Sequence, residues 1–231
     1  MTLLEVPVLD ITPLCCGDVA ARRRLAGEID RACRDIGFLV IAGHGVSETM
    51  LAEVASVSRA FFALDESEKQ RVARPGMDIA RGYIGHGEES VARSQGVLDA
   101  PGDLNESLMI GPVDVPDAPY YHAPMAGRHF YPNLWPAQPA ALRPLYERCF
   151  RDLSQLAATI MRGFALALDL DERFFDPLID RHIIPTCLSN DCFDPVSLGD
   201  RSDLFWHLHE LVPGVSAGGK DFVVAVPDLM A

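Results

Sequence analysis

The sequence lacks the features that mark secreted and membrane-spanning chains. Its six cysteines form no C-x-x-C pair and no regular spacing, which favours free thiols in a reducing compartment over a disulfide framework. It has no long apolar run that could span a bilayer. The opening stretch MTLLEVPVLD carries acidic residues where a secretory signal carries basic ones. We therefore expect a cytoplasmic chain with no membrane partner.

Basic residues are also scarce, because 20 Lys and Arg stand against 33 Asp and Glu, which gives a formal net charge of −13. An acidic surface repels the phosphate backbone of nucleic acids, so no nucleic-acid partner is expected. The 231 residues, 48% hydrophobic and 23% charged, have the composition of an ordinary globular protein. This length predicts one large domain or two small ones.

Hydrophobic periodicity predicts alternating strands and helices in the first third of the chain. VPVLDI (6–11) alternates as a strand does, and residues 18–36 repeat apolar side chains at helical spacing. FLVIAGHG (38–45) is typical of a buried strand that leaves into a tight turn. Ser47 can cap the helix that follows, and DESEKQRVA (65–73) predicts a short charged helix.

The region between Arg74 and Pro139 is rich in Gly and Pro, with strand-like islands at RGYIG and ESLMIG. This pattern predicts long loops and a hairpin, which more often shape a site than a core. The strongest helix is predicted from Pro144 to Leu168. Its apolar stripe, which we expect to be buried along its whole length, consists of Tyr146, Cys149, Phe150, Leu153, Leu156, Ala157, Ile160, Met161, Phe164 and Leu168.

Several segments together resemble one enzyme family. VPVLDITPL, ACRDIGFLVIAGHGV and SRAFFALDESEKQRVA are similar to the N-terminal region of the isopenicillin N synthase-like oxygenases, which are Fe(II)/2-oxoglutarate-dependent dioxygenases. RGYIGHGEE, DLNESLMIG and the long helix continue the resemblance to about His182. It implies an α+β fold, in which a jelly-roll (double-stranded β-helix) core carries an N-terminal helical layer. The implied division is a dioxygenase N-terminal region at 1–120, then the central helix and the start of the oxygenase jelly roll at 121–231.

The resemblance implies oxidation of a small organic substrate, with Fe(II) as cofactor and 2-oxoglutarate as co-substrate. Family members hold the iron with an H-x-D pair and a distal His, and an R-x-S pair grips 2-oxoglutarate. This sequence contains no H-x-D, and its nearest equivalent is Arg201-Ser202-Asp203. The guanidinium of Arg201 stays protonated and cannot coordinate iron. We therefore assign no catalytic residue and expect that the chain binds neither Fe(II) tightly nor 2-oxoglutarate productively.

The same reasoning predicts an incomplete jelly roll. DFVVAVPDLM (221–230) resembles the family's strand before the distal His, and no residue of the sequence occupies the position of that His. We expect the DFVVAVP strand to have an unpaired edge or to pair atypically. An exposed sheet edge predicts self-association.

Asp203, His207 and His209 form the one cluster that could hold a metal in another way. If SDLFWHLHEL is a strand, the three side chains share a face, as H-x-H pairs do in zinc sites. If it is a helix capped by Ser202, the two imidazoles point apart and cannot chelate. The helix is slightly favoured, so this is a weak candidate.

Arg81 and Tyr83 are the candidate substrate-binding residues, since by resemblance they lie in the substrate-side segment. His86-Gly87-Glu88 is the one H-x-E, but it lies where the family keeps no metal ligand. His44 is expected to be structural. The alternatives are a non-catalytic binding or regulatory protein on the same scaffold, or a divergent metal-binding protein that uses the Asp203 cluster.

Overall fold

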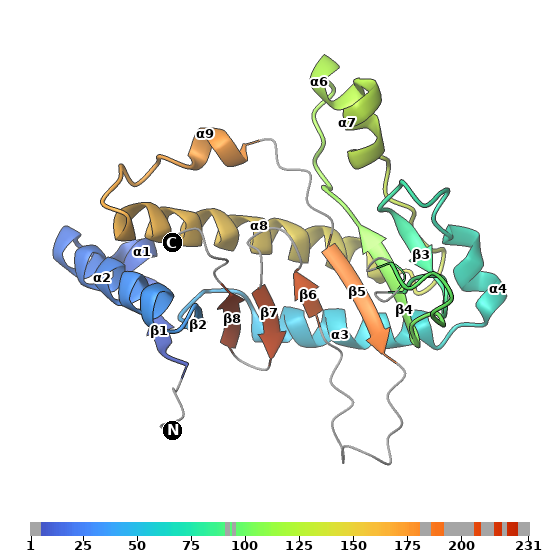
Figure 1. The fold of residues 1–231 in the computed structure, drawn as a ribbon, viewed down its shortest axis with the longest axis horizontal. Coiled ribbons are helices and arrows are strands. Elements are labelled where there is room, and N and C mark those ends of the chain that lie inside the picture. The colour runs from blue at the N-terminus through green and yellow to red at the C-terminus, as the bar shows by residue number, and fades with distance from the viewer. Residues whose placement is uncertain are drawn as a thin grey trace, which may run out of the picture. The chain divides into compact units, whose positions relative to one another are not determined.

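The computed structural model describes residues 6–90, 93 and 96–180, together with the backbone of the strands at 186–191, 206–208, 215–218 and 221–225 (Figure 1). The chain divides into two compact units, each built from separate stretches of sequence. The first comprises Met1–Leu51, Arg148–His182 and Leu208–Ala231, and the second comprises Ala52–Glu147 and Ile183–His207. The domain boundary at residue 120 stays a prediction.

The first unit contains strands in the order β1-β2-β8-β7. β1 (Val8–Asp10) runs parallel to β2 (Phe38–Ala42), and β2 pairs antiparallel with β8 (Asp221–Ala225). β8 also pairs antiparallel with β7 (Val215–Gly218). The predicted strands at 6–11 and 38–45 are therefore confirmed. The expected unpaired edge is wrong for β8, because neighbours on both sides satisfy its backbone hydrogen-bonding groups.

Helices α1 (Thr12–Cys16) and α2 (Val19–Asp35) belong to the same unit, and α2 packs against β1 and β2. Helix α2 begins where predicted because the side chain of Asp18 accepts a hydrogen bond from the backbone N–H of Ala21 at 2.7 Å. It ends before Gly37, whose φ of 76° lies in the left-handed region that glycine tolerates.

Helix α8 (Leu142–Ala167) is the longest element, with 26 residues, and begins slightly before the predicted Pro144. The predicted stripe is buried at Tyr146, Cys149, Phe150, Leu153, Leu156, Ala157, Ile160 and Phe164. Burial along the whole stripe is wrong, since Met161 is half-buried and Leu168 is 40% exposed. Leu168 lies beyond the end of the helix, where Asp169 adopts φ 57° and turns the chain toward α9 (Asp176–Ile179). Across the described residues, no helix combines the length and apolarity that a membrane crossing needs.

The second unit contains strands in the order β6-β5-β4-β3. β3 (Gly82–Ile84), β4 (Asn105–Ile110) and β5 (Thr186–Asp191) pair antiparallel, and β6 (Trp206–Leu208) pairs antiparallel with β5. The first two are the strand-like islands predicted from the sequence. α4 (Glu66–Lys69) and the 3₁₀ helix η1 (Gln70–Val72) lead to this hairpin, and Ala73 bridges to Tyr83.

Helix α3 (Glu48–Phe62) has residues in both units. It begins after Ser47, as predicted, because the Ser47 hydroxyl oxygen accepts a hydrogen bond from the backbone N–H of Met50 at 3.3 Å.

The favoured helix across the Asp203 cluster is wrong at residues 206–208. Trp206 pairs with Leu188 and His207 pairs with Cys187 in the β5–β6 ladder. Hydrogen bonds to a distant strand outweigh a weak local helical preference. The sequence of residues 206–208 does not show this pairing with β5. Asp203 and His209 lie outside the described residues.

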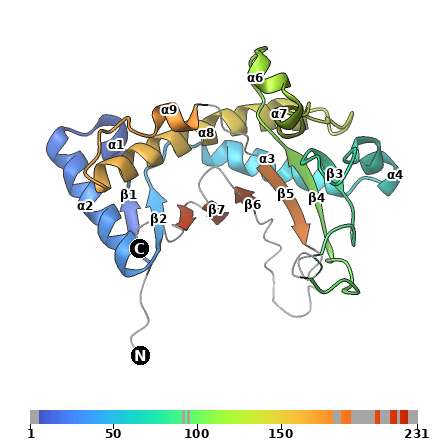
Figure 2. The same cartoon turned by 45° about the horizontal axis from the view of Figure 1, so that its top comes forward.

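The Gly- and Pro-rich region is not made of loops alone. α6 (Pro119–His122) and α7 (Pro124–His129) follow β4 and project beyond its end (Figures 1 and 2). Each begins with a proline, which suits the first turn of a helix because no N–H is needed there. That local signal was present in the sequence, so these two short helices could have been predicted.

Candidate functional site

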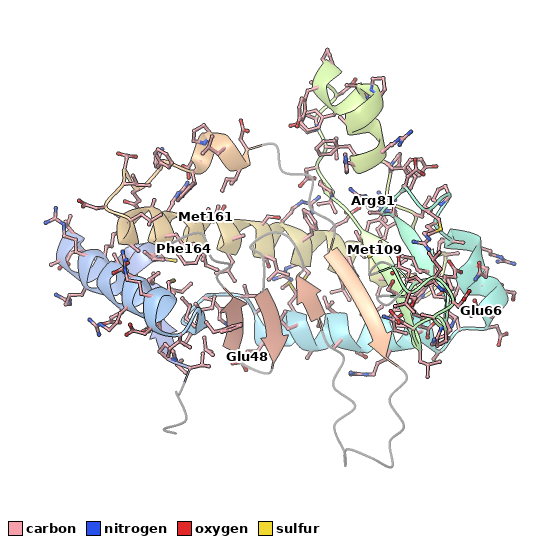
Figure 3. All side chains as sticks on the ribbon, viewed as in Figure 1. Glu48, Glu66, Arg81, Met109, Met161 and Phe164 are labelled. Atoms are coloured by element: carbon pink, nitrogen blue, oxygen red, sulfur yellow. The ribbon has the colours of Figure 1, made fainter. Side chains whose placement is uncertain are left out.

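Buried charge is concentrated in the second unit. Within the described residues, the charged side chains that are buried are those of Lys69, Arg81 and Glu106. They come from α4, from the residue before β3 and from β4. Figure 3 labels Arg81 together with Glu66, the neighbour of Lys69 on α4. A buried charge is costly without a partner, so the partners of these three define the candidate site.

The β3–β4 register brings Tyr83 to Glu106. Tyr83 lies opposite Leu108, and Glu106 lies two residues from Leu108 on the same face of β4. The Tyr83 hydroxyl therefore reaches the carboxylate diagonally and donates to Glu106 Oε2 at 2.6 Å. The ring of Tyr83 is fully buried and stands edge-on to Phe61, with 6.0 Å between centroids.

Lys69 completes this cluster. Its Nζ lies 2.5 Å from Glu106 Oε2 and 3.2 Å from Glu66 Oε2, and 5.2 Å from the centroid of the Tyr83 ring. Glu66 and Lys69 are one helical turn apart, so α4 places both on one side. The side chains of Lys69 and Glu106 are only 7% and 3% exposed, which makes this a buried ion pair.

The surroundings of Lys69 and Tyr83 shift the pKa of each group. Burial alone would lower the pKa of Lys69, but the hydrogen bonds and charges of Glu106 and Glu66 outweigh it and raise that pKa. Burial, followed by the hydrogen bond to Glu106, raises the pKa of Tyr83. At neutral pH Lys69 therefore stays charged and Tyr83 stays protonated. These two groups hold the site together and are not poised to transfer protons.

The H-x-E segment lies at the edge of the cluster. His86 Nε2 is 3.7 Å from Glu106 Oε1, whereas Glu88 lies 3.8 Å from Arg74 Nε. The two side chains of the motif thus contact different partners. In the described ranges, no group of three His, Cys, Asp or Glu side chains could hold a metal. These ranges therefore do not fit an Fe(II) centre, which needs two imidazoles and a carboxylate.

The metal candidates lie elsewhere. Asp203 and His209 fall outside the described residues, and only the backbone of His207 is described, in β6. Their role as ligands stays a prediction.

The substrate candidates Arg81 and Tyr83 are both buried, at 1% and 0% exposure. Their contact with a substrate stays a prediction, and a direct contact would require neighbouring segments to move. His44 has a structural contact, since its Nδ1 accepts a hydrogen bond from the backbone N–H of Val46 at 3.1 Å.

The sequence comparison identifies the family. The family described as "non-haem dioxygenase in morphine synthesis N-terminal" matches residues 6–138. The chain belongs to the isopenicillin N synthase-like non-haem dioxygenases. The predicted resemblance to these dioxygenases is thereby confirmed.

Two curated dioxygenase relatives illustrate the match. The 2-oxoglutarate-Fe(II) type oxidoreductase hxnY of Emericella nidulans is 33% identical over 180 residues, which cover 75% of this chain and 49% of the relative. The isopenicillin N synthase of Streptomyces jumonjinensis is 31% identical over 179 residues, which cover 76% and 51%. The chain spans about half the length of the curated relatives it matches.

Solved structures of oxygenases match the fold of this chain. A putative 2OG-Fe(II) oxygenase family protein from Caulobacter crescentus matches with a TM-score of 0.63 and 22% identity, over 80% of this chain and 55% of that chain. The dioxygenase for auxin oxidation in rice matches with a TM-score of 0.57 and 20% identity, over 86% of this chain and 55% of that chain. The described helices and strands thus share the architecture of 2-oxoglutarate-Fe(II) oxygenases.

Sequence reasoning missed the Lys69–Glu106 pair, although both residues lie in segments that carried the family resemblance. Their separation of 37 positions leaves no local pattern that would pair them. A charged residue within the apolar alternation of ESLMI was the one available signal, because such a residue needs a partner when it is buried.

Proposed function

We propose that the chain supplies the N-terminal region and central helix of a 2-oxoglutarate- and Fe(II)-dependent oxygenase that acts on a small organic substrate, and that these 231 residues hold no competent iron centre. The family membership supports the first part. The second part, that these residues hold no competent iron centre, is supported by the absence of any H-x-D from the sequence, because that pair supplies two of the three iron ligands in the family.

Anaerobic titration with Fe(II) followed by 2-oxoglutarate tests this proposal. The purified 231-residue chain is expected to show no metal-to-ligand charge-transfer band and to release no succinate from 2-oxoglutarate in air. Succinate release that depends on added Fe(II) and disappears in Asp203→Ala would overturn the second part. An intact oxygenase from the same family, assayed in parallel, controls for the quality of the reagents.

A divergent metal site is the second candidate function, favoured by the strand conformation of Trp206–Leu208. If the strand continues to His209, then His207 and His209 occupy alternate positions on one face, as an H-x-H zinc pair requires. Zn²⁺ is then expected to raise the melting temperature, and His207→Ala to abolish that shift. Equal shifts in His207→Ala and in the unchanged chain would exclude the site. With no shift in either, the non-catalytic binding protein would remain as the alternative.

We also propose that the described strands form part of a jelly roll rather than a whole one, and that an open edge allows self-association. β1 is the candidate edge, because within the described strands it pairs with β2 alone and Val8 is 59% exposed. Sedimentation velocity should show concentration-dependent association that Val8→Lys reduces. A monomer at all concentrations would contradict this.

A further inference from the structure

The segment 112–132 leaves the sheet and returns to it at one place. It begins after Gly111, at the end of β4, carries α6 and α7, and ends before Asn133 (Figures 1 and 2). A long excursion whose two ends meet can move as a unit unless its base is tied. The contacts at this base therefore decide where the two helices lie.

Asn133 provides the first tie. Its Oδ1 accepts a hydrogen bond from the backbone N–H of Gly111 at 2.7 Å. Its Nδ2 donates to the carbonyl oxygen of Gly111 at 3.1 Å and to that of Pro112 at 3.4 Å. One side chain thus joins the two ends of the segment.

Arg81 provides the second tie. Its guanidinium donates to the carbonyl oxygen of Ala80, beside β3, and to that of His129, the last residue of α7. A cation also suits the negative end of a helix. Arg81 is 1% exposed, and burial lowers its pKa to about 10, so it remains charged at neutral pH.

Gly111 makes room for this arrangement. A Cβ at position 111 would overlap the Arg81 guanidinium, so only glycine allows the strand to pass so close. The two ties therefore share one residue, since Asn133 bonds the backbone of Gly111 and the Arg81 guanidinium occupies the space that a Cβ at this position would need. Arg81 Nε has no hydrogen-bond partner in the described part of the chain, so the guanidinium is held through its two terminal nitrogens.

The tied helices carry an aromatic cluster. Phe130 directly follows His129 and is 8% exposed, with its ring centroid 4.8 Å from that of Tyr121 and 6.1 Å from that of Tyr120. Tyr120 is 46% exposed. Fixing the carbonyl of His129 thus also fixes Phe130 and the tyrosines that pack on it.

We propose that Arg81 is a positioning residue, which with Asn133 fixes the 112–132 segment and its aromatic cluster on the sheet. In this role Arg81 does not contact a ligand itself, because its guanidinium stays bound to the backbone carbonyls of Ala80 and His129. It would influence ligand binding only by fixing the positions of Tyr120 and Tyr121. The proposal does not depend on the oxygenase activity, and it is tested in the whole 231-residue chain.

Hydrogen–deuterium exchange separates this role from a direct ligand contact. In Arg81→Met and Gly111→Ala, amides of 126–130 should exchange roughly tenfold faster or more, because hydrogen bonds to a charged donor are lost. Gly111→Ala keeps the arginine but displaces it, and Asn133→Ala should give a smaller increase at the same amides. Arg81→Lys should restore little, because one ammonium cannot span both carbonyls. The near-ultraviolet circular dichroism of the tyrosines should weaken in the same variants while they remain folded.

Arg74→Met is the matched control, because Arg74 also lies beside β3 but pairs with Glu88 and Glu89. It should leave exchange at 126–130 unchanged. Wild-type exchange at these amides in both Arg81→Met and Gly111→Ala would overturn the proposal. An equal increase along α2 and α7 in all three variants would also overturn it, since the loss would then be one of general stability.

Discussion

The two units bury different kinds of side chain. In the described part of the chain, every buried polar or charged residue, namely Ser58, Lys69, Arg81, Glu106 and Ser107, lies in the second unit. The first unit has an apolar core, and its ion pairs Arg22–Glu172 and Arg162–Asp176 remain about one third exposed. Water screens the exposed pairs, whereas the buried charges depend on each partner being in place. We therefore expect the stability of the first unit to depend mainly on apolar packing, and that of the second unit to depend also on the placement of its buried charged groups.

The largest effect is expected where a buried charge loses its partner. Glu106→Ala removes the buried carboxylate that Lys69 and the Tyr83 hydroxyl share and leaves them only the exposed carboxylate of Glu66, so the free energy of unfolding should fall by about 3 kcal/mol. Urea denaturation measures this loss. Lys69→Met combined with Glu106→Leu should recover most of it, because no uncompensated charge remains. A loss below about 1 kcal/mol in Glu106→Ala would remove the distinction between the units.

A packing change tests the first unit. Gly163 lies on α8, and a Cβ there would come within 2.9 Å of Leu14 Cδ1 and 3.2 Å of Ile29 Cδ1. Gly163→Leu should therefore lower the free energy of unfolding by about 1–3 kcal/mol through overpacking. Gly27, on α2, has no atom within 4 Å of such a Cβ, so Gly27→Leu is the matched control. It should stabilise the chain by up to about 1 kcal/mol through helix propensity.

If Gly163→Leu instead behaves like Gly27→Leu, then α8 does not pack closely on α1 and α2, and the account of the first unit fails.

A smaller effect is expected from the exposed ion pairs. Arg22 Nη1 lies 3.0 and 3.1 Å from the two carboxylate oxygens of Glu172, with both side chains partly exposed. Arg22→Met should cost about 1 kcal/mol or less, and the difference should shrink in high salt. Thermal unfolding at two salt concentrations measures both. A loss as large as that of Glu106→Ala would show that the first unit also depends on polar geometry.

The smallest effect concerns acid. The hydrogen bond from Arg162 lowers the pKa of Asp176 below its ordinary value. A carboxyl whose pKa is lower in the folded state stabilises that state above its unfolded pKa, and the contribution disappears as the pH falls through the folded pKa. The difference in melting temperature between wild type and Arg162→Met should thus be present at neutral pH and shrink below pH about 4. A difference that persists in acid would mean that Arg162 stabilises by packing alone.

The sequence predicted the elements whose signals are local. Residues 18–36 contain both a cap at Asp18 and a helical apolar stripe, and the helix was found there. The strands at 38–42 and ESLMI were likewise found. The expectation that the first of them is buried throughout was wrong, because Leu39 and Ile41 are buried but Phe38 is 47% exposed. The predicted burial of the apolar stripe was wrong at Leu168, because periodicity alone did not reveal that the helix ends before the turn at Asp169.

The candidate site was harder to predict from the sequence than these helices and strands. Arg81 and Tyr83 were singled out by family resemblance, and no local pattern pointed to their burial. The strand at Trp206–Leu208 was mistaken for a helix because the ladder with β5 is not visible in the sequence of the strand itself. Hydrogen bonds and burial between distant segments overrule weak local propensities, and such pairings follow only from the assembled sheet.

By itself, the sequence determined the family, the acidic charge, the lack of an H-x-D pair and the sites of the long helix and the first strands. These follow from residue identity and from periodicities of two and about 3.6, which act over a few turns or residues. The tertiary structure decided that Lys69 pairs with Glu106 and that Arg81 binds the end of α7 beside Gly111. The physical reason is that a charge enters the interior only where other segments supply its partners, and the partners here lie tens of residues away.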